Sequence, residues 1–483
     1  MTAPRVVVVG GGVTGLSLAC TLQDEAHRRQ APLSITVLEA GPTAGGHAQT
    51  ADADGFVIDA GPNGFLSREP ETLALVDMLG LRDRLVEAAA ASRRRYIVRN
   101  RRLCLVPDSP AAFLMSPALS WRGKLRLLGE PWAPAPPGRE ESVHEFATRR
   151  LGGEAADMLV ETAVAGICAG DSHCLSVSAQ FPLMTEMERE HGGLVRAMFA
   201  RRKRRKAPSR LMAFDRGMGV LSGAMSARLG GQLRLNAAVE CVERVAGGWR
   251  TRLRGGDAID ADHVLFAAPA RATALLVHQL APELASALSE VPYAGLAVVA
   301  LGYQTADIPR PPLDGYGYLV TRAEGLTTLG VLWESSIFPG RAPDGHALLR
   351  VFLGGARRPG LAGAGDEALV TLAREELRQV LGVTRPPAHV SVFRWPEAIA
   401  QYTVGHDQRL GRIRERLAKH PGLHVCGTSY DGVSFNHAIK SGRTTARTLA
   451  ARLWSDAAAE PTPAPAAAAL QFEPRGLAFG AER

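Results

Sequence analysis

The first forty residues alternate between short, wholly apolar runs and a helical repeat of apolar positions. The run RVVVV (5–9) is β-branched and lacks polar alternation, which is typical of a parallel strand buried on both faces. After three glycines, apolar residues recur at the spacing of one helix face: Val13, Leu16, Ala19 and Cys20. A second β-branched run, SITVLEA, follows at 34–40. The pattern predicts strand, glycine turn, helix and strand, which is a βαβ unit.

Further along the chain the period of the pattern changes several times. Ser142 and Glu145 have the spacing of a capping box, which predicts the start of a mostly helical segment that extends to about residue 200. Strand-like runs return over 233–270, and glycine-spaced apolar runs over 293–355 predict an antiparallel sheet. The segment DEALVTLAREELRQVLG (366–382) predicts an amphipathic helix. The chain is therefore expected to be an α/β protein with a separate helical part.

Composition places the chain among ordinary globular proteins. It has 483 residues, 46% hydrophobic and 22% charged, which is enough for two or three domains with sizeable cores. No apolar run reaches the roughly 18 residues of a transmembrane helix, and Met1–Arg5 does not open a signal peptide. The six cysteines are scattered without C-x-x-C pairs, which disfavours a disulfide framework or a zinc site and fits a reducing cytoplasm.

The net charge of +8 is concentrated in arginine-rich runs at 93–102 and 201–206. A basic surface can attract nucleic acid, an anionic bilayer or an acidic small molecule, and a solvated loop is the plainer interpretation. No nucleic-acid motif accompanies these runs, so no nucleic-acid partner is expected. Residues 107–138 combine prolines, basic residues and large apolar side chains, among them Phe113, Leu114, Met115 and Trp121. That mixture fits either a membrane-surface contact or a helical subdomain with an irregular core.

The glycines after the first strand form a dinucleotide-binding motif in its proper context. Gly10 permits the tight turn, Gly12 lets a pyrophosphate approach the backbone, and Gly15 lets the helix pack on the strand. Glu39 ends the second strand, where its carboxylate can accept hydrogen bonds from ribose hydroxyls and would repel a 2′-phosphate. The motif therefore favours NAD or FAD over NADP.

Two further segments favour FAD over NAD. Gly45 and Gly46 supply a second close backbone approach just after the ribose carboxylate. Near the C-terminus, a strand, a glycine turn and a helix recur around Gly427, Gly432 and Val433, where backbone amides can reach a flavin. A nicotinamide dinucleotide does not need so distant a segment, whereas a flavin with its ribityl chain does.

At this point the chain resembles a known family. The opening motif, Gly45-Gly46, FDRGMGVL (214–221), VLFAAPA (264–270) and the C-terminal segment look like the amine-oxidase/phytoene-desaturase flavoproteins. Within that superfamily, four stretches resemble the oxygen-dependent protoporphyrinogen oxidases of haem biosynthesis: GPNGF (61–65), residues 144–171, DGYGYLV (314–320) and YTVGHDQRL (402–410). The resemblance runs from about residue 5 to residue 453.

The resemblance implies an α/β fold in three parts. These are a Rossmann-like FAD-binding domain, an interleaved α+β substrate domain and a helical, membrane-contacting domain. The expected boundaries are 1–75, 207–270 and 394–453 for the FAD-binding domain, 76–91 and 271–393 for the substrate domain, and 92–206 for the helical domain. A disordered Ala/Pro-rich tail is expected over 454–483.

The resemblance also assigns site residues. Gly10, Gly12, Gly15, Glu39 and Val239 match the ADP-binding positions, and Gly427, Gly432 and Val433 match the flavin end. Arg95 aligns with an arginine that pairs with a substrate propionate, and Tyr96 with the adjacent aromatic residue. Gly166 matches a glycine over the active site. Three residues fall near apolar positions that sandwich the macrocycle, although each also fits a plain core position: Leu319, Leu332 and Phe352.

The chain departs from the family pattern at two positions. His47 stands where many members have Arg or Lys after the glycine pair, which puts the phosphate contact there in doubt. Ala165 stands where some members have a second arginine, so the propionate contacts are expected to differ.

The implied activity is the FAD-dependent oxidation of protoporphyrinogen IX to protoporphyrin IX, with dioxygen as acceptor and hydrogen peroxide as product. Flavin N5 carries the chemistry, and no catalytic side chain or metal is assigned. Coproporphyrinogen III oxidation by the same fold is the alternative, and a flavin-binding scaffold with little turnover is a third. Amine or carotenoid oxidation is disfavoured by the family-specific stretches. The implied location is the cytoplasm, peripheral on the membrane, and homodimer formation is left open.

Overall fold

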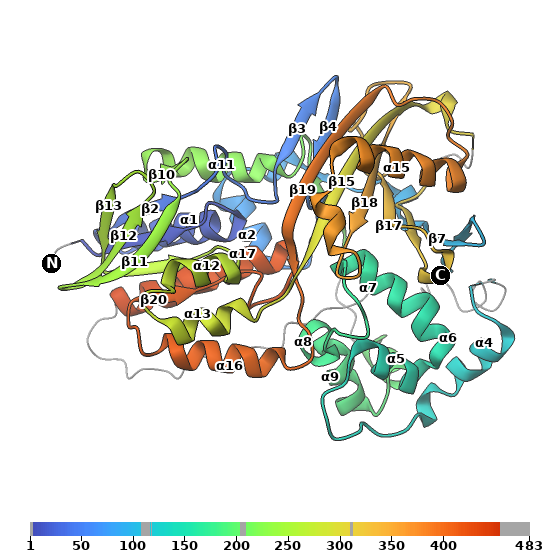
Figure 1. Ribbon diagram of the computed structural model, residues 1–483, viewed down its shortest axis with the longest axis horizontal. Coiled ribbons are helices and arrows are strands. Elements are labelled where there is room, and N and C mark those ends of the chain that lie inside the picture. Colours follow the sequence, from blue (N-terminus) through green and yellow to red (C-terminus); the bar gives the residue numbers. More distant parts are fainter. Residues whose placement is uncertain (1–2, 108–115, 117, 203–208, 310–312, 455–483) are drawn as a thin grey trace.

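The computed structural model describes residues 3–107, 116, 118–202, 209–309 and 313–454. The molecule is elongated and has three parts (Figure 1). A parallel sheet and its helices form the end that carries the N-terminus, a large sheet forms the other end, and a group of helices lies beneath that large sheet. The long strands β15 (Tyr293–Gln304) and β19 (His389–Ala400) run from the large sheet toward the parallel-sheet part.

The parallel sheet has five strands in the order β10-β2-β1-β14-β20. Their bounds are Leu233–Arg234 (β10), Ser34–Leu38 (β2), Arg5–Val9 (β1), His263–Phe266 (β14) and Leu423–Val425 (β20). Val6 and Val8 of the central strand pack in one core with helices α1 (Val13–Arg28), α11 (Gly219–Leu229) and α17 (Phe435–Leu453). Val7 and Val9 pack in the other core, with α12 (Ala270–Val277), α13 (Pro282–Ser289) and α16 (His406–Leu417). Because both faces are covered, the strand carries no polar alternation.

Three small sheets complete the fold. One is the antiparallel meander of β11 (Val239–Val245), β12 (Gly248–Leu253) and β13 (Ala258–Ala261). A second is the hairpin of β3 (Thr50–Ala53) and β4 (Phe56–Asp59). The third joins β5 (Phe65–Leu66), β9 (Leu211–Phe214) and β6 (Leu85–Glu87), beside α2 (Pro70–Met78).

The large sheet has seven strands in the order β19-β15-β18-β17-β16-β7-β8. The remaining bounds are His346–Gly354 (β18), Thr328–Trp333 (β17), Gly317–Val320 (β16), Arg95–Arg99 (β7) and Arg102–Leu105 (β8). Val299, Leu301, Leu349 and Val351 pack on α15 (Asp366–Leu381), which covers one face. The residues that alternate with these along the strands, such as Leu332 and Phe352, point to the other face. That face forms one wall of the central cavity.

The helical part lies below the large sheet (Figure 1). Its main helices are α4 (Trp121–Leu128), α5 (Val143–Leu151), α6 (Gly153–Ala155), α7 (Glu161–Cys168), α8 (Val177–Gln180), α9 (Pro182–His191) and α10 (Leu194–Arg202), with a π-helical turn over Ala156–Val160. The predicted capping box is confirmed, since Ser142 Oγ accepts from Glu145 N at 3.1 Å and Ser142 N donates to the Glu145 carboxylate at 2.9 Å.

The structure differs from two of the expected boundaries. Strands β7 and β8 lie in the segment 92–206 that was expected to be helical, yet they complete the edge of the large sheet. β7 pairs in parallel with β16, more than two hundred residues away, and such a partner leaves no local signal. The boundary expected at 393/394 falls inside β19, which is one continuous strand.

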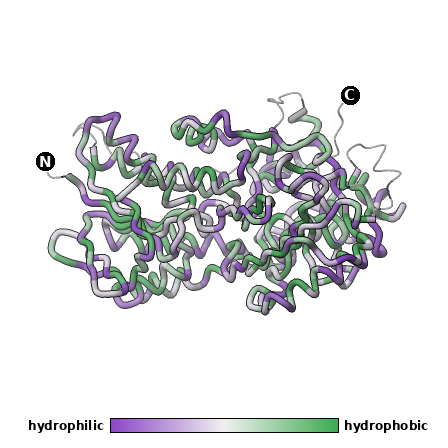
Figure 2. Tube along the Cα trace, turned by 90° about the horizontal axis from the view of Figure 1, so that it is seen from above, coloured by the Kyte–Doolittle hydropathy of each residue, from purple (hydrophilic) through white to green (hydrophobic). Residues whose placement is uncertain are grey.

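Some expectations lie outside the described residues. These are the Ala/Pro-rich tail from residue 455, the apolar residues Phe113, Leu114 and Met115, and most of the basic run at 201–206. Along the described trace, hydrophobic and hydrophilic segments alternate over the whole length of the molecule (Figure 2). Within these residues, no helix combines the length and the hydropathy that crossing a membrane requires.

Candidate active site

One cavity of about 1080 Å³ extends between the parallel sheet, the large sheet and helix α7. At one end it is lined by Gly10 and Gly12, which lie between β1 and α1. Gly10 has a φ of +109° and a Cβ there would lie 3.0 Å from the Ala267 carbonyl, so the turn requires glycine. Gly15 does not line the cavity. A Cβ at Gly15 would lie 2.0 Å from the Gly10 carbonyl oxygen, so this glycine lets the helix pack on the turn.

Glu39 lies at the end of β2 and lines the same end of the cavity. Its carboxylate accepts hydrogen bonds from the backbone N–H groups of Gly11 and Gly41, both at 2.8 Å. These bonds fix the carboxylate beside the glycine turn, where it can accept the hydroxyl groups of a ribose. A carboxylate held in this way disfavours a 2′-phosphate electrostatically.

The second glycine pair lies directly against the first turn. Gly45 N donates to the Gly11 carbonyl at 2.8 Å, and Gly12 and Gly45 form a parallel bridge. Gly45 and Gly46 line the cavity, and both have positive φ. Val239, at the start of β11, lines the cavity near Arg254, as expected for the adenine end.

The C-terminal segment closes the cavity on the third side. Gly427 and Val433 line the cavity, and so do Ser434 and Phe435 at the start of α17. Ser434 caps that helix by accepting from His437 N at 3.2 Å, so the helix N-terminus is directed at the cavity. Gly432 does not line the cavity. Its N–H donates to the Tyr402 hydroxyl at 2.7 Å, and a Cβ there would lie 2.2 Å from His437 Nδ1.

These backbone surfaces fit FAD. Glycines leave room for a ligand at three turns, which contain Gly10 and Gly12, Gly45 and Gly46, and Gly427. The Glu39 carboxylate lies at one end of the cavity, and the N-terminus of α17 lies at the flavin side. Gly10, Gly12, Glu39, Gly45, Gly46 and Val239 would hold the ADP half, and Gly427 with Val433 would approach the flavin half. His47 also lines the cavity and packs edge-on against Trp395, with ring centroids 4.7 Å apart.

The other half of the cavity is lined by side chains of the large sheet and of helix α7. Arg95 and Leu319 lie on one face because their strands pair in parallel through Gly317. Phe352 and Leu332 extend the same face across β18 and β17. Gly166, on α7, lies opposite. A Cβ there would lie 2.5 Å from Leu319 Cδ2, so Gly166 keeps the slot open. The structure thus brings together five of the six residues expected on the substrate side. Tyr96 also borders the cavity, but its ring packs against Trp333 on the other face of the sheet, with centroids 5.3 Å apart.

Among the cavity-lining residues that were not predicted individually are Asn63, Tyr316 and Trp395. The Arg95 guanidinium lies over the Tyr316 ring, 5.1 Å from its centroid. Asn63 hydrogen-bonds the Tyr316 hydroxyl and donates to the Glu334 carboxylate at 3.3 Å. Asn63 and Tyr316 lie in the family-like stretches GPNGF (61–65) and DGYGYLV (314–320). These stretches indicated the region of the site, but nothing in them distinguished these two residues from their neighbours.

The cavity's phenols are held in the neutral form. Burial raises the pKa of Tyr293 to about 12, although its hydroxyl contacts Ser429 Oγ and accepts from Ala270 N, both at 2.7 Å. Burial also raises the pKa of Tyr316. These hydroxyls therefore remain donors at neutral pH and are poor proton acceptors.

Comparison with known proteins identifies the family. The model of the family described as flavin containing amine oxidoreductase matches residues 13–450. The coproporphyrinogen III oxidase of Bacillus subtilis (strain 168) is 30% identical, over 91% of this chain and 96% of its own length. Protoporphyrinogen oxidase 1, chloroplastic, of Arabidopsis thaliana is 32% identical, over 91% of this chain and 87% of its own length.

Solved structures agree with this result. An Exiguobacterium sp. 255-15 protein, provisionally named a protoporphyrinogen oxidase, superposes with a TM-score of 0.82 at 26% identity, over 94% of this chain and 100% of its own. A reduced UDP-galactopyranose mutase shares the fold at 15% identity, with a TM-score of 0.72. The protein is a flavoprotein oxidoreductase that uses FAD. The chain belongs to the flavin-containing amine oxidoreductase family, together with the protoporphyrinogen and coproporphyrinogen III oxidases that it resembles.

Proposed function

We propose that this protein oxidises a porphyrinogen to a porphyrin in haem biosynthesis, with protoporphyrinogen IX as substrate, dioxygen as acceptor and hydrogen peroxide as product. The support from sequence is the level of identity to enzymes named protoporphyrinogen oxidase and coproporphyrinogen III oxidase, over most of each chain. The support from geometry is a single cavity that joins the glycine-lined turns to an apolar slot.

The slot is the observation that carries the proposal. Its walls are aliphatic and aromatic side chains from the strands of the large sheet and from helix α7, and Arg95 lies on β7, next to the edge strand β8. A flat apolar macrocycle with carboxylates on one edge has the complementary distribution of groups. A guanidinium can hold a carboxylate through two parallel hydrogen bonds.

The chain's residues bind and orient the substrate. Leu319, Leu332 and Phe352 supply apolar walls that exclude water, and Arg95 fixes one edge, so that a meso carbon is held toward the flavin end. Bound FAD supplies the two-electron acceptor that dioxygen regenerates. Three two-electron oxidations each remove one hydride from a meso carbon. Of the three protons lost with them, two come from pyrrole N–H groups and one, after tautomerisation, from the fourth meso carbon.

Proton release does not call for a strong base in the slot. The phenol of Tyr316 has a raised pKa and stays protonated. The three protons lost by the macrocycle balance those taken up when three dioxygen molecules are reduced to hydrogen peroxide. The residues of the slot are therefore assigned to binding and orientation only.

A specific observation keeps coproporphyrinogen III as the second candidate. That substrate carries four propionates, and Arg95 lies in a chain segment with five further arginines between residues 93 and 102. Arg94 pairs with Asp314 at 2.9 Å, which engages one of them. The Bacillus relative is named for this second substrate. Among the lining residues that the structure describes in the slot, Arg95 is the cation, which favours protoporphyrinogen.

A direct competition tests the assignment. Purified protein is supplied with protoporphyrinogen IX and coproporphyrinogen III separately under air, and porphyrin fluorescence is followed. A higher kcat/KM for protoporphyrinogen supports the first proposal, and the reverse preference supports the second. Flavin-replete protein that oxidises neither compound would reject both.

We also propose that the protein works in the cytoplasm at a membrane surface. Helix α4 and the turn after it expose four large apolar side chains, Trp121, Leu125, Leu128 and Trp132, each more than 60% accessible. Basic residues such as Arg122 lie on the same helix, a combination that suits an anionic bilayer. Co-sedimentation with phosphatidylglycerol vesicles should exceed that with phosphatidylcholine, and a W121S/L125S variant should lose it. Equal recovery of both proteins in the supernatant would reject the contact.

A further inference from the structure

An ion pair lies behind the wall of the slot, fully removed from solvent. The side chains of Arg350, on β18, and Glu334, directly after β17, are 0% and 2% exposed, and Arg350 Nη1 donates to Glu334 at 2.6 Å. Neither residue lines the cavity. Burying two charges is costly and does not by itself stabilise a fold, so the other contacts of the pair indicate what it does.

The other side-chain hydrogen bonds of the pair, and its contact with an aromatic ring, lead to the cavity wall. Arg350 Nη2 donates to the Gly61 carbonyl at 2.5 Å, and its guanidinium lies 5.1 Å from the centroid of the Phe352 ring. Glu334 Oε2 accepts from Asn63 Nδ2 at 3.3 Å. Gly61, Asn63 and Phe352 all line the cavity. The pair therefore supports the turn after β4 and the β18 wall at the same time.

The contacts continue from Asn63 to the substrate anchor. Asn63 hydrogen-bonds the Tyr316 hydroxyl, and the Tyr316 ring lies under the Arg95 guanidinium. Glu334 and Arg95 are thus connected through Asn63 and Tyr316. A change in the Asn63 amide would be transmitted to the residue that is proposed to hold the carboxylate.

We propose that Glu334 and Arg350 form a positioning pair that fixes Asn63 and Tyr316, and through them sets where Arg95 holds a substrate carboxylate. This inference rests on the proposed function, because it requires a porphyrin-type carboxylate ligand in the slot. Neither residue touches the ligand. We expect the pair to affect the ratio of the affinities for a ligand with free carboxylates and for the same ligand with esterified carboxylates.

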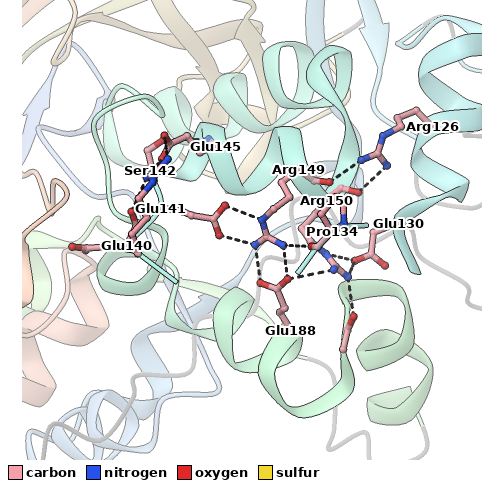
Figure 3. Close-up of polar contacts among 12 residues, drawn as sticks. Arg126, Glu130, Pro134, Glu140, Glu141, Ser142, Glu145, Arg149, Arg150 and Glu188 are labelled. Carbon is pink, nitrogen blue, oxygen red and sulfur yellow. Dashed lines mark hydrogen bonds and ion pairs between the residues drawn. The ribbon is translucent and has the colours of Figure 1, made fainter. Parts of the chain in front are cut away.

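A second buried pair provides a matched control. Glu130 and Arg150 in the helical part are 0% and 2% exposed, and Arg150 Nε donates to Glu130 at 2.8 Å (Figure 3). Glu130 also accepts from the N–H groups of Leu194 and Val195, at 2.8 and 3.1 Å. None of these four residues lines the cavity. A Glu130→Gln variant therefore disturbs a buried pair of the same kind without touching the slot.

The experiment measures product binding without turnover. The FAD-loaded protein is titrated with protoporphyrin IX and with its dimethyl ester, and the ratio of the two Kd values is taken. We expect the wild type to prefer the free acid about tenfold or more, since a guanidinium–carboxylate contact is charge-assisted. Glu334→Gln and the apolar double variant Glu334→Leu/Arg350→Met should both lower that ratio several-fold, and the double variant should recover thermal stability relative to the single one. Glu130→Gln should lower the Tm and keep the wild-type ratio.

The outcomes separate this inference from the proposed function. An unchanged ratio in the double variant, at wild-type FAD content, overturns the positioning pair while leaving the porphyrinogen site intact. An equal fall of the ratio in Glu130→Gln overturns it as well, because the effect would then be general. Wild-type protein that binds neither porphyrin rejects the proposed function and this inference together. If Glu334→Gln does not fold, the double variant alone decides.

Discussion

The two halves of the cavity present different parts of the chain to their ligands. The cofactor half is made mainly of backbone, and a Cβ at Gly10 or Gly45 would lie 3.0 or 2.8 Å from neighbouring atoms. The substrate half is made of side chains on a sheet face, with Arg95 at one edge. A backbone surface depends on a few glycines close together in sequence, whereas a side-chain surface is assembled from strands far apart. FAD binding should therefore be most sensitive to substitutions that add atoms at glycines. Substrate binding should be most sensitive to substitutions that remove a side-chain group.

The largest effect is expected from Gly15→Val. A Cβ at this position would lie 2.0 Å from a backbone oxygen of Gly10, and backbone cannot move aside as a side-chain end can. We expect purified protein without bound FAD, measured by visible absorbance after desalting. Gly223→Ala is the control, because this glycine also lies in a helix but has no atom within 4 Å of the added Cβ. Full flavin content in Gly15→Val would show that the two halves do not differ in this way.

Arg95→Ala should weaken substrate binding without affecting FAD binding. Loss of a charge-assisted contact costs about 1.5–3 kcal/mol, so KM for the porphyrinogen should rise about 10- to 100-fold while FAD content stays the same. Steady-state kinetics and flavin absorbance measure the two effects. Arg102→Ala, on the neighbouring strand and outside the cavity lining, is the matched control. An unchanged KM in Arg95→Ala would remove this residue from the site.

Gly166→Ala should have a smaller effect, because the obstructing atoms can move. The added Cβ would meet the end of the Leu319 side chain at 2.5 Å, and a leucine can change rotamer. We expect a several-fold rise in KM with FAD retained, and partial recovery when Leu319→Val is added. Gly153→Ala, in the same helical segment but with open space around the Cβ, should leave KM unchanged. A loss of FAD in Gly166→Ala would contradict the division of the cavity.

The remaining effect concerns the pH dependence of stability and has no direct consequence for substrate binding. His406 is 1% exposed and stacks on Tyr402, which accepts from Gly432 N, and burial lowers the pKa of His406 to about 3. Because the unfolded chain binds a proton near pH 6.5 and the folded chain does not, this contribution to stability is complete above pH 6.5. It is lost between pH 6.5 and about 3, by at most about 1.4 kcal/mol per pH unit.

Urea unfolding at pH 7 and pH 5 measures the slope. His406→Phe should have a shallower dependence on pH than the wild type, and His27→Gln, at an exposed helix end, should match the wild type. The same slope in His406→Phe and wild type would show that other groups cause any acid sensitivity. His424 and His437, whose pKa values burial lowers to about 4, would then be the next variants to test.

The same difference explains what the sequence could reveal. The βαβ unit was predicted closely, with strands at Arg5–Val9 and Ser34–Leu38 and a helix at Val13–Arg28, because its period and its glycines are local. The amphipathic helix over 366–382 is also confirmed, at Asp366–Leu381. Strands β7 and β8 were missed. They form a hairpin with each other, and only β7 pairs with β16, which is distant in sequence and joins the hairpin to the sheet.

Site residues followed the same rule. The resemblance selected residues that line the cavity, with the exceptions of Gly15, which acts in packing, and Gly432, whose N–H is used by Tyr402. The sequence did not indicate that Glu334 and Arg350 are buried, because a single charged residue in an apolar run is normally interpreted as an exposed position. Their burial depends on each other and on Gly61, nearly three hundred residues away.

The central claim is that electrons pass from a porphyrinogen in the apolar slot to FAD in the glycine-lined half of the same cavity. Mixing the FAD-loaded protein with protoporphyrinogen IX in the absence of oxygen tests it most directly. We expect the flavin absorbance to bleach as porphyrin appears, and to return when air is admitted. Porphyrin formation without bleaching, or bleaching that Arg95→Ala does not slow at low substrate, would contradict the account.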